Sequence, residues 1–309
     1  MSPLAAWPAA LGFSFLAAGF YMYRAEIFGP TSTGGSRVLS LAPVFMAAPL
    51  AAFSGEHFTA ARGLANAVPK WMPWHVPIAY FVGCALVAAA LSFVARRCIR
   101  WSGPLLALMF ALFVLTLHLP NAIAHAGRRI FWVFPFRESQ FALGALSIFV
   151  YAQQGASPAE RSGKFALFAK LWTALVVIYF GTQNLLYPQY TPGVPDEITT
   201  SAWVPAPHLL SYLTGTILVT LGIAMLFRKT AVAATTYVGI LMTVLAVALF
   251  GPDLFLAHTV QSRVQAINFV FDTLLFAGAM FAVARVIPAP VSRQIEQTQA
   301  PVVAGGAVA

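Results

Sequence analysis

Residues 75–95 (HVPIAYFVGCALVAAALSFVA) and residues 207–227 (PHLLSYLTGTILVTLGIAMLF) are apolar stretches related by a constant shift along the chain, since 75 + 132 = 207. The same shift aligns Tyr80 with Tyr212 and Gly83 with Gly215. It also aligns three short motifs with their partners: Trp71-Met72-Pro73 with Trp203-Val204-Pro205, Arg96-Arg97 with Arg228-Lys229, and Leu119-Pro120-Asn121 with Gly251-Pro252-Asp253. A repeat of this length predicts that one hydrophobic, multi-helix module occurs twice.

The composition is that of an integral membrane protein. Hydrophobic residues make up 60% of the chain and charged residues only 9%, the mean hydropathy is +0.79, and soluble domains carry about 25% charged residues. The net charge of +9 comes from 18 lysines and arginines that stand in short clusters between apolar runs. Charge of that kind orients membrane helices. Because no contiguous basic face exists, nucleic acid is excluded as a partner.

Nine stretches are apolar over about 20 residues, the length that spans a bilayer. They lie near residues 4–23, 38–58, 75–95, 101–119, 136–153, 165–186, 207–227, 231–251 and 265–286. The predicted organisation is an N-terminal span with its loop (1–37), a first four-helix module (38–153), a linker (154–164), a second four-helix module (165–287) and a disordered tail (288–309). We expect the first span to be retained rather than cleaved as a signal peptide, because no lysine or arginine precedes Arg24.

The distribution of basic residues between the predicted spans indicates an orientation. Ten lysines and arginines fall on one side and six on the other, and the richer side is expected to be cytoplasmic. The N terminus is then outside and the C terminus cytoplasmic, in the inner (plasma) membrane. Each module has an even number of helices, so the two modules are parallel, unlike the inverted repeats of many transporters.

Polar residues near the outer ends of these spans define the candidate site. Glu56 and His57 end one helix, His118 ends another at matching depth, and Glu138 and Asp272 begin the last helix of each module. Ionisable residues inside a span are costly and indicate function. A Glu–His pair suits proton transfer near neutral pH, so Glu56 with His57 or His118 is the candidate for proton handling. The alternative is that these side chains only satisfy one another between helices or end a helix at the interface.

Glu56, His57 and His118 are also the candidate ligands for haem or a metal ion. Two histidines at equal depth could ligate haem, but no other feature supports haem and it is not favoured. A metal site needs three or more convergent ligands, and Glu56, His57 and His118 have no diagnostic spacing. We therefore expect no metal site.

A further group of residues is expected to line a ligand pocket at the outer surface. Trp71, Pro73, Trp74 and Trp203 lie in Trp- and Pro-rich loops before the second helix of each module. Tryptophan at that depth is also the ordinary aromatic belt of a membrane protein. The pocket prediction adds residues near the outer helix ends: Asn121, Arg129, Glu138, Gln183, Asn184 and Asp272.

The order of these motifs resembles the DoxX-like family of membrane proteins. The first module carries Phe53-Ser54-Gly55-Glu56-His57-Phe58, Val68-Pro69-Lys70-Trp71-Met72-Pro73, Tyr80-Phe81-Val82-Gly83 and Leu117-His118-Leu119-Pro120-Asn121. The second carries Phe180-Gly181-Thr182-Gln183-Asn184, Pro192-Gly193-Val194-Pro195, Trp203-Val204-Pro205 and Tyr212-Leu213-Thr214-Gly215. The resemblance covers roughly residues 38–286 and implies a four-helix module in each half.

The resemblance also implies an accessory role in a quinone-linked membrane redox system, since family members are similar to DoxD, a small subunit of a thiosulfate:quinone oxidoreductase. Quinone is then the cofactor to consider, and the lipid bilayer and other membrane redox subunits are the partners. The family has no proven catalytic motif to transfer, so whether the chain is an enzyme stays open. The rival classes are binding or transport of a hydrophobic small molecule or lipid, and a structural membrane subunit.

The two modules differ at one informative place, where Glu56-His57 of the first becomes Gln183-Asn184 of the second. Amides keep hydrogen bonding but do not titrate. If protons move, we expect the first module to carry them and the second to act as scaffold.

Overall fold

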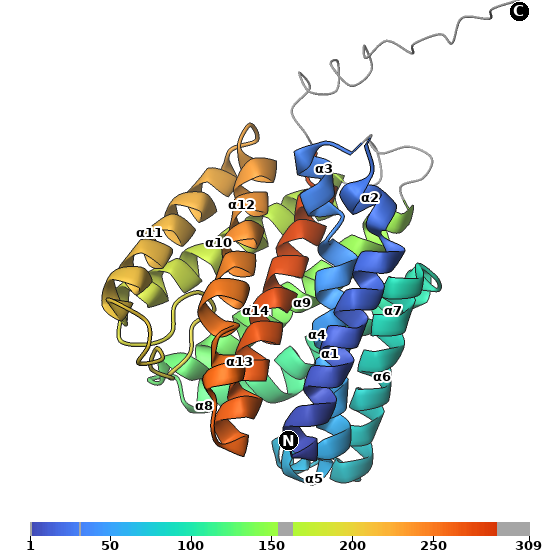
Figure 1. Cartoon of the computed structure of the whole chain (residues 1–309), viewed down its shortest axis with the longest axis vertical. Helices are drawn as coiled ribbons and strands as arrows, with labels where there is room; N and C mark the ends of the chain where they lie inside the picture. Colours follow the sequence, from blue (N-terminus) through green and yellow to red (C-terminus); the bar gives the residue numbers. More distant parts are fainter. Residues whose placement is uncertain (1, 31, 154–162, 289–309) are drawn as a thin grey trace, which may run out of the picture.

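The apolar runs form long helices, and the computed structural model describes them over residues 2–30, 32–153 and 163–288 (Figure 1). The first half contains α1 (Pro3–Met22), α2 (Arg24–Phe28), α3 (Gly34–Leu39), α4 (Ala42–Thr59), α5 (Ala61–Leu64), the 3-10 turn η1 (Ala65–Ala67), α6 (His75–Ala95), α7 (Ile99–Phe113), the π-helical turn η2 (Val114–His118), α8 (Leu119–Ala124) and α9 (Arg129–Gln153). The second half contains α10 (Gly163–Leu186), α11 (Pro207–Leu226), α12 (Ala231–Val244), the π-helical turn η3 (Leu245–Phe250), α13 (Asp253–Leu256) and α14 (Val260–Val286).

Eight helical stretches in these ranges are long and apolar enough to cross a bilayer. They confirm the prediction of an all-α, multi-pass membrane protein. The remaining expected span, 136–153, lies within α9, whose 25 residues also suffice in length. It is not among the eight apolar stretches, and it contains Arg137, Glu138 and Gln140. The predicted linker (154–164) and tail (288–309) lie outside the described residues, except for positions 163, 164 and 288.

Helix α14 is the central element of the bundle, and it packs against α4, α9 and α12 (Figure 1). Its close contact with α4 depends on Gly278, where an added Cβ would lie 2.8 Å from the backbone N of Met46 and C of Phe45. The two halves pair their helices in the same order: α4 with α6 and α7 with α9, then α10 with α11 and α12 with α14. Helix α1 covers α4 at the side of the bundle.

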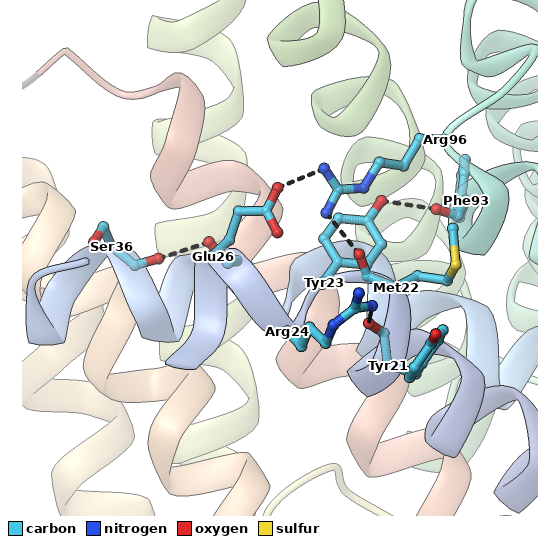
Figure 2. A network of polar contacts seen from close by, with 9 residues as sticks. Tyr21, Met22, Tyr23, Arg24, Glu26, Ser36, Phe93 and Arg96 are labelled. Atoms are coloured by element: carbon cyan, nitrogen blue, oxygen red, sulfur yellow. Dashed lines mark hydrogen bonds and ion pairs between the residues drawn. The ribbon is translucent and has the colours of Figure 1, made fainter. Parts of the chain in front are cut away.

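Tyr23 and Arg96 join the end of α1 to the end of α6 (Figure 2). The Tyr23 hydroxyl donates to the carbonyl oxygen of Phe93 at 2.7 Å. The Arg96 guanidinium lies 3.9 Å from the centroid of the Tyr23 ring and pairs with Glu26 at 2.5 Å. The hydrogen bond from Arg96 holds the pKa of Glu26 below its usual value, and burial raises the pKa of Tyr23 to about 12.

The wild-type protein is expected to lose stability at alkaline pH through Tyr23, and the variant Tyr23→Phe is expected not to show this loss. The folded-state pKa of Tyr23 lies above the usual 10.0, so its contribution is complete below pH 10 and is lost as the pH rises toward 12. The wild-type melting temperature should therefore fall more steeply over this range than that of Tyr23→Phe. At neutral pH the variant should lose about 1 kcal/mol with its hydrogen bond. Thermal unfolding in detergent measures both effects, with Tyr21→Phe, at a 64% exposed position, as the control. The prediction would be contradicted if the melting temperatures of the wild type and of Tyr23→Phe fell equally steeply with rising alkaline pH.

Candidate functional site

One cavity of about 860 Å³ is lined by both apolar and ionisable side chains. Part of its wall is apolar and at most 5% exposed: Leu86, Phe110, Phe141 and Leu275. Its polar residues come from α4 (Glu56, His57), the end of η2 (His118), α9 (Arg137, Glu138) and α14 (Gln261, Gln265, Asn268, Asp272, Thr273). With Asp196, four of the nine acidic residues of the chain line this one cavity. The rim includes Leu4 of α1, Leu64 of α5 and Val260 of α14. Helix α5 lies at the end of the bundle where the N terminus is marked (Figure 1).

Arg137 pairs with carboxylates from two helices. Its Nη1 lies 3.3 Å from Asp272 Oδ2, and its Nη2 lies 3.7 Å from Glu138 Oε1. The three side chains are 12% to 19% exposed. Because Glu56 and Asp196 also line the cavity, the carboxylates outnumber the arginine there.

Glu56 and His57 both line the cavity, but they do not hydrogen-bond to each other. His57 Nδ1 lies 2.8 Å from the carbonyl oxygen of Phe53, one turn earlier in α4. A carbonyl only accepts, so Nδ1 carries a proton and Nε2 of the neutral ring is an acceptor. Glu56 Oε1 is buried and makes no hydrogen bond within the described ranges. His118 stacks on Phe134 with ring centroids 5.5 Å apart. The three residues proposed for proton handling therefore share one cavity without a direct Glu–His bond.

The prediction that a carboxylate opens the last helix of each module is wrong. Helix α9 begins at Arg129 and α14 at Val260, before the expected starts at 136 and 265. Glu138 and Asp272 thus lie in the third and fourth turns of their helices. The expected starts missed residues 129–135 of α9, which are apolar after Arg129, and the polar first turn of α14, which is stabilised by a capping box between Thr259 and Ser262.

The tryptophan and proline residues expected in the pocket lie away from this cavity. Trp71 and Trp74 are 71% and 77% exposed. Trp203 is 41% exposed, and its indole N–H donates to Asp253 Oδ1 at 2.8 Å. Two further residues of the predicted pocket, Pro73 and Asn121, are also exposed. Exposed rings at these positions suit the aromatic belt of a membrane protein.

Asn184 fixes a loop that forms one wall of the cavity. Its Nδ2 donates to the carbonyl oxygens of Phe180 (2.7 Å) and Gly193 (3.0 Å), and its Oδ1 accepts from the Gly193 N–H (2.9 Å). Gly193 has a φ of 102°, and a Cβ there would lie 2.9 Å from Leu245 Cδ1, so the position requires glycine. The residues that follow line the cavity: Val194, Pro195, Asp196 and Ile198.

Arg129 and Gln183 hold the same loop instead of lining the cavity. The Arg129 guanidinium donates to the carbonyl oxygen of Asp196 and lies 4.4 Å and 4.5 Å from the ring centroids of Tyr187 and Tyr190. Its Nη1 lies 3.5 Å from Gln183 Oε1. Both residues thus stabilise the wall that Asn184 anchors.

Sequence reasoning left Arg137 and Asn268 out of the predicted site, although both line the cavity. A signal was available for Arg137, because an arginine inside a predicted span normally faces the interior and has a partner. No comparable signal distinguishes Asn268 from other amides.

Asn184→Ala is expected to loosen the loop at residues 187–206. The change removes three hydrogen bonds and leaves buried backbone groups of Gly193 without a partner, at a cost of about 2 kcal/mol. Hydrogen exchange of the Gly193 amide should accelerate by roughly tenfold or more. The matched control is Thr182→Ala, since the exposed Thr182 hydroxyl donates to the carbonyl oxygen of Ile178 within α10. Equal exchange in the two variants would show that Asn184 does not anchor the loop.

Together, the helices and the cavity define the class of this protein: a multi-pass helical membrane protein with a charge-paired cavity inside its bundle. No protein-family model, curated protein or solved structure matches the chain. Among the described residues, no group of three or more His, Cys, Asp or Glu side chains is arranged to hold a metal ion.

Proposed function

We propose that the protein binds a lipid-soluble small molecule with a hydrogen-bonding head group, of the quinone class, in this cavity. The observation that carries the proposal is a cavity of about 860 Å³ that combines buried leucine and phenylalanine side chains with Arg137, two histidines and carboxylates. Ligand sites of about 300–1,000 Å³ are mostly apolar, with a few polar groups that orient the ligand. A quinone ring and tail suit the apolar wall, and its oxygens suit the polar groups.

The proposed role is that of a DoxX-like accessory component in a quinone-linked redox system, in contact with other membrane subunits. The two-module architecture that underlies it is supported by the shared helix pairing and by the π-helical turns. The turn η2 ends at His118 and η3 ends at Phe250, and the shift of 132 residues that relates the two halves also relates these two positions. Phe250 stacks on Phe269 at 5.0 Å, as His118 stacks on Phe134 at 5.5 Å. In the second module an apolar ring therefore takes the place of the histidine.

The proposed orientation follows the positive-inside rule, with the N terminus outside, the C terminus cytoplasmic and the cavity near the outer leaflet of the inner membrane. Glu56 is the proposed proton acceptor, with His57 or His118 as its partner in proton exchange. The support for this role is one oxygen of Glu56 that is buried and makes no hydrogen bond to the residues that the structure describes. Histidine exchanges protons near neutral pH.

Binding or transport of a hydrophobic molecule or lipid without redox chemistry is the second candidate. It is favoured by the rim of the cavity, where Leu4 and Val260 are apolar and 42% and 44% exposed. An apolar rim admits an acyl chain as readily as a quinone tail.

Mass spectrometry and absorption spectra of lipids extracted from the purified protein test the proposal. We expect quinone in near-equimolar amount, and at least about tenfold less of it in His118→Phe, which copies the second module and removes one good hydrogen bond. The matched control is His125→Phe, at an exposed position outside the cavity, which should retain its quinone. Phospholipid without quinone in the wild-type protein would overturn the redox proposal in favour of the second candidate.

A further inference from the structure

Five arginines lie on α2, on α3 and at the turn between α6 and α7. Residues 2–41 and 75–113 contain these five and a single acidic residue, Glu26. Arg96 pairs with Glu26 and donates to the carbonyl oxygen of Met22, so it joins the α6–α7 turn to α2 (Figure 2). The other four are exposed, pair with no carboxylate in the described part of the chain, and form a basic surface: Arg24, Arg37, Arg97 and Arg100.

Aromatic rings place this basic surface at the level of the lipid head groups. Tyr21 and Trp101 are 64% and 61% exposed. The guanidinium of Arg24 lies 4.3 Å from the centroid of the Tyr21 ring, and that of Arg100 lies 5.2 Å from the Trp101 ring. Exposed tyrosine and tryptophan of membrane proteins lie where the acyl chains meet the head groups. A guanidinium held on such a ring therefore lies beside the lipid phosphates.

We propose that the basic surface binds anionic phospholipids through their phosphate groups. Arg24 uses only Nη1 within the described residues, in a bond to the carbonyl oxygen of Tyr21, and Arg37 uses only Nη2, in a bond to that of Gly29. The remaining N–H groups of both are free to donate, and arginine forms paired, charge-assisted hydrogen bonds with phosphate oxygens. A zwitterionic lipid binds less tightly, because its head group brings a positive charge to the same surface. This proposal does not depend on the ligand of the cavity.

The expected preference follows from the number of exposed arginines. Each lysine or arginine beside an anionic lipid surface strengthens binding about fivefold. Neighbouring charges do not contribute additively, so we expect phosphatidylglycerol to bind at least about fivefold more tightly than phosphatidylcholine. Salt screens exposed charges, with a screening length of about 10 Å at 0.1 M and about 3 Å at 1 M. The preference should therefore fall toward one at about 1 M salt.

Electron spin resonance of spin-labelled lipids tests the proposal on the full chain in phosphatidylcholine vesicles. The relative association constant of spin-labelled phosphatidylglycerol and phosphatidylcholine gives the preference, which should be at least about fivefold at about 0.1 M salt. Equal constants would overturn the proposal. Inorganic phosphate, added at constant ionic strength, should not displace the phosphatidylglycerol. Displacement would assign the surface to a free anion and would also overturn the proposal.

Two variants assign the preference to the basic surface. The combined change Arg24→Gln, Arg97→Gln and Arg100→Gln should lower the ratio of the two association constants toward one. It keeps Arg96, whose contacts with Glu26 and the Tyr23 ring hold α6 to α1 and α2. Arg97→Gln alone should lower the ratio about twofold or more, and it tests the proposal if the combined variant fails to fold. An unchanged ratio in Arg97→Gln and in the combined variant would overturn the proposal.

The matched control removes three positive charges from exposed positions outside the basic surface. These changes are Arg62→Gln, Lys70→Gln and Arg128→Gln. The control variant should keep the wild-type preference for phosphatidylglycerol. An equal loss of preference in the control and in the combined variant would show that the net charge of the protein selects the lipid, and the proposed surface would be wrong.

Discussion

Arg137→Leu is expected to lower the free energy of unfolding by about 3–5 kcal/mol, since removal of one partner leaves enclosed carboxylates without a counter-charge. Asp272 and Glu138 both lie within 4 Å of the guanidinium, at 3.3 Å and 3.7 Å, and are 17% and 12% exposed. Chemical unfolding of the detergent-solubilised protein measures the change. Adding Asp272→Asn and Glu138→Gln to Arg137→Leu should restore most of the loss, because no unpaired charge then remains.

The control for this prediction is Arg128→Leu. Arg128 also pairs with a carboxylate, Glu197 at 3.4 Å, but its side chain is 63% exposed. Exposed ion pairs contribute less than about 1 kcal/mol, so this variant should unfold almost like the wild type. Equal losses in Arg137→Leu and Arg128→Leu would mean that the cavity does not shield its charges.

Gly278→Ala is expected to destabilise the bundle by about 3 kcal/mol, at the upper end of the usual cost of overpacking. A Cβ at this position would lie 2.8 Å from the backbone of α4 at Phe45 and Met46. Backbone cannot move aside as a flexible side chain can, so α14 and α4 must separate along their contact. Because α14 also carries Asp272 and Asn268, the same change should disturb the cavity, and thermal unfolding with and without ligand measures both effects.

The same substitution at Gly63 of α5 provides the control. A Cβ there meets no atom within 4 Å, and alanine is favoured over glycine in a helix by about 1 kcal/mol. Gly63→Ala should therefore leave stability unchanged or raise it. The prediction for Gly278 would be refuted if the two alanine variants had the same melting temperature.

Asn184 and Gln183 both act on the loop that follows α10. The sequence comparison predicted that Gln183-Asn184 would act as scaffold where the first module has Glu56-His57. In the structure Asn184 bonds the backbone of Gly193 through both ends of its amide, and Gln183 contacts Arg129. The amides thus stabilise a loop that forms a wall of the cavity to which Glu56 and His57 contribute. The scaffold prediction rested on chemistry alone, because the loop contact could not be foreseen from spacing.

The sequence alone determined that the chain forms apolar helices of membrane-spanning length, because hydropathy and run length are local properties. It also predicted that Glu56, His57 and His118 lie at one depth, since a constant rise per residue fixes distance along a helix, and all three line the cavity. Only the tertiary structure decided which side chains meet, such as Arg137 with Asp272, 135 positions apart. Helices that are apolar on every face do not reveal which face turns inward, since lipid and protein interior are equally apolar. The rotation of each helix, and with it the composition of the cavity, is set by close contacts such as that of Gly278 with α4.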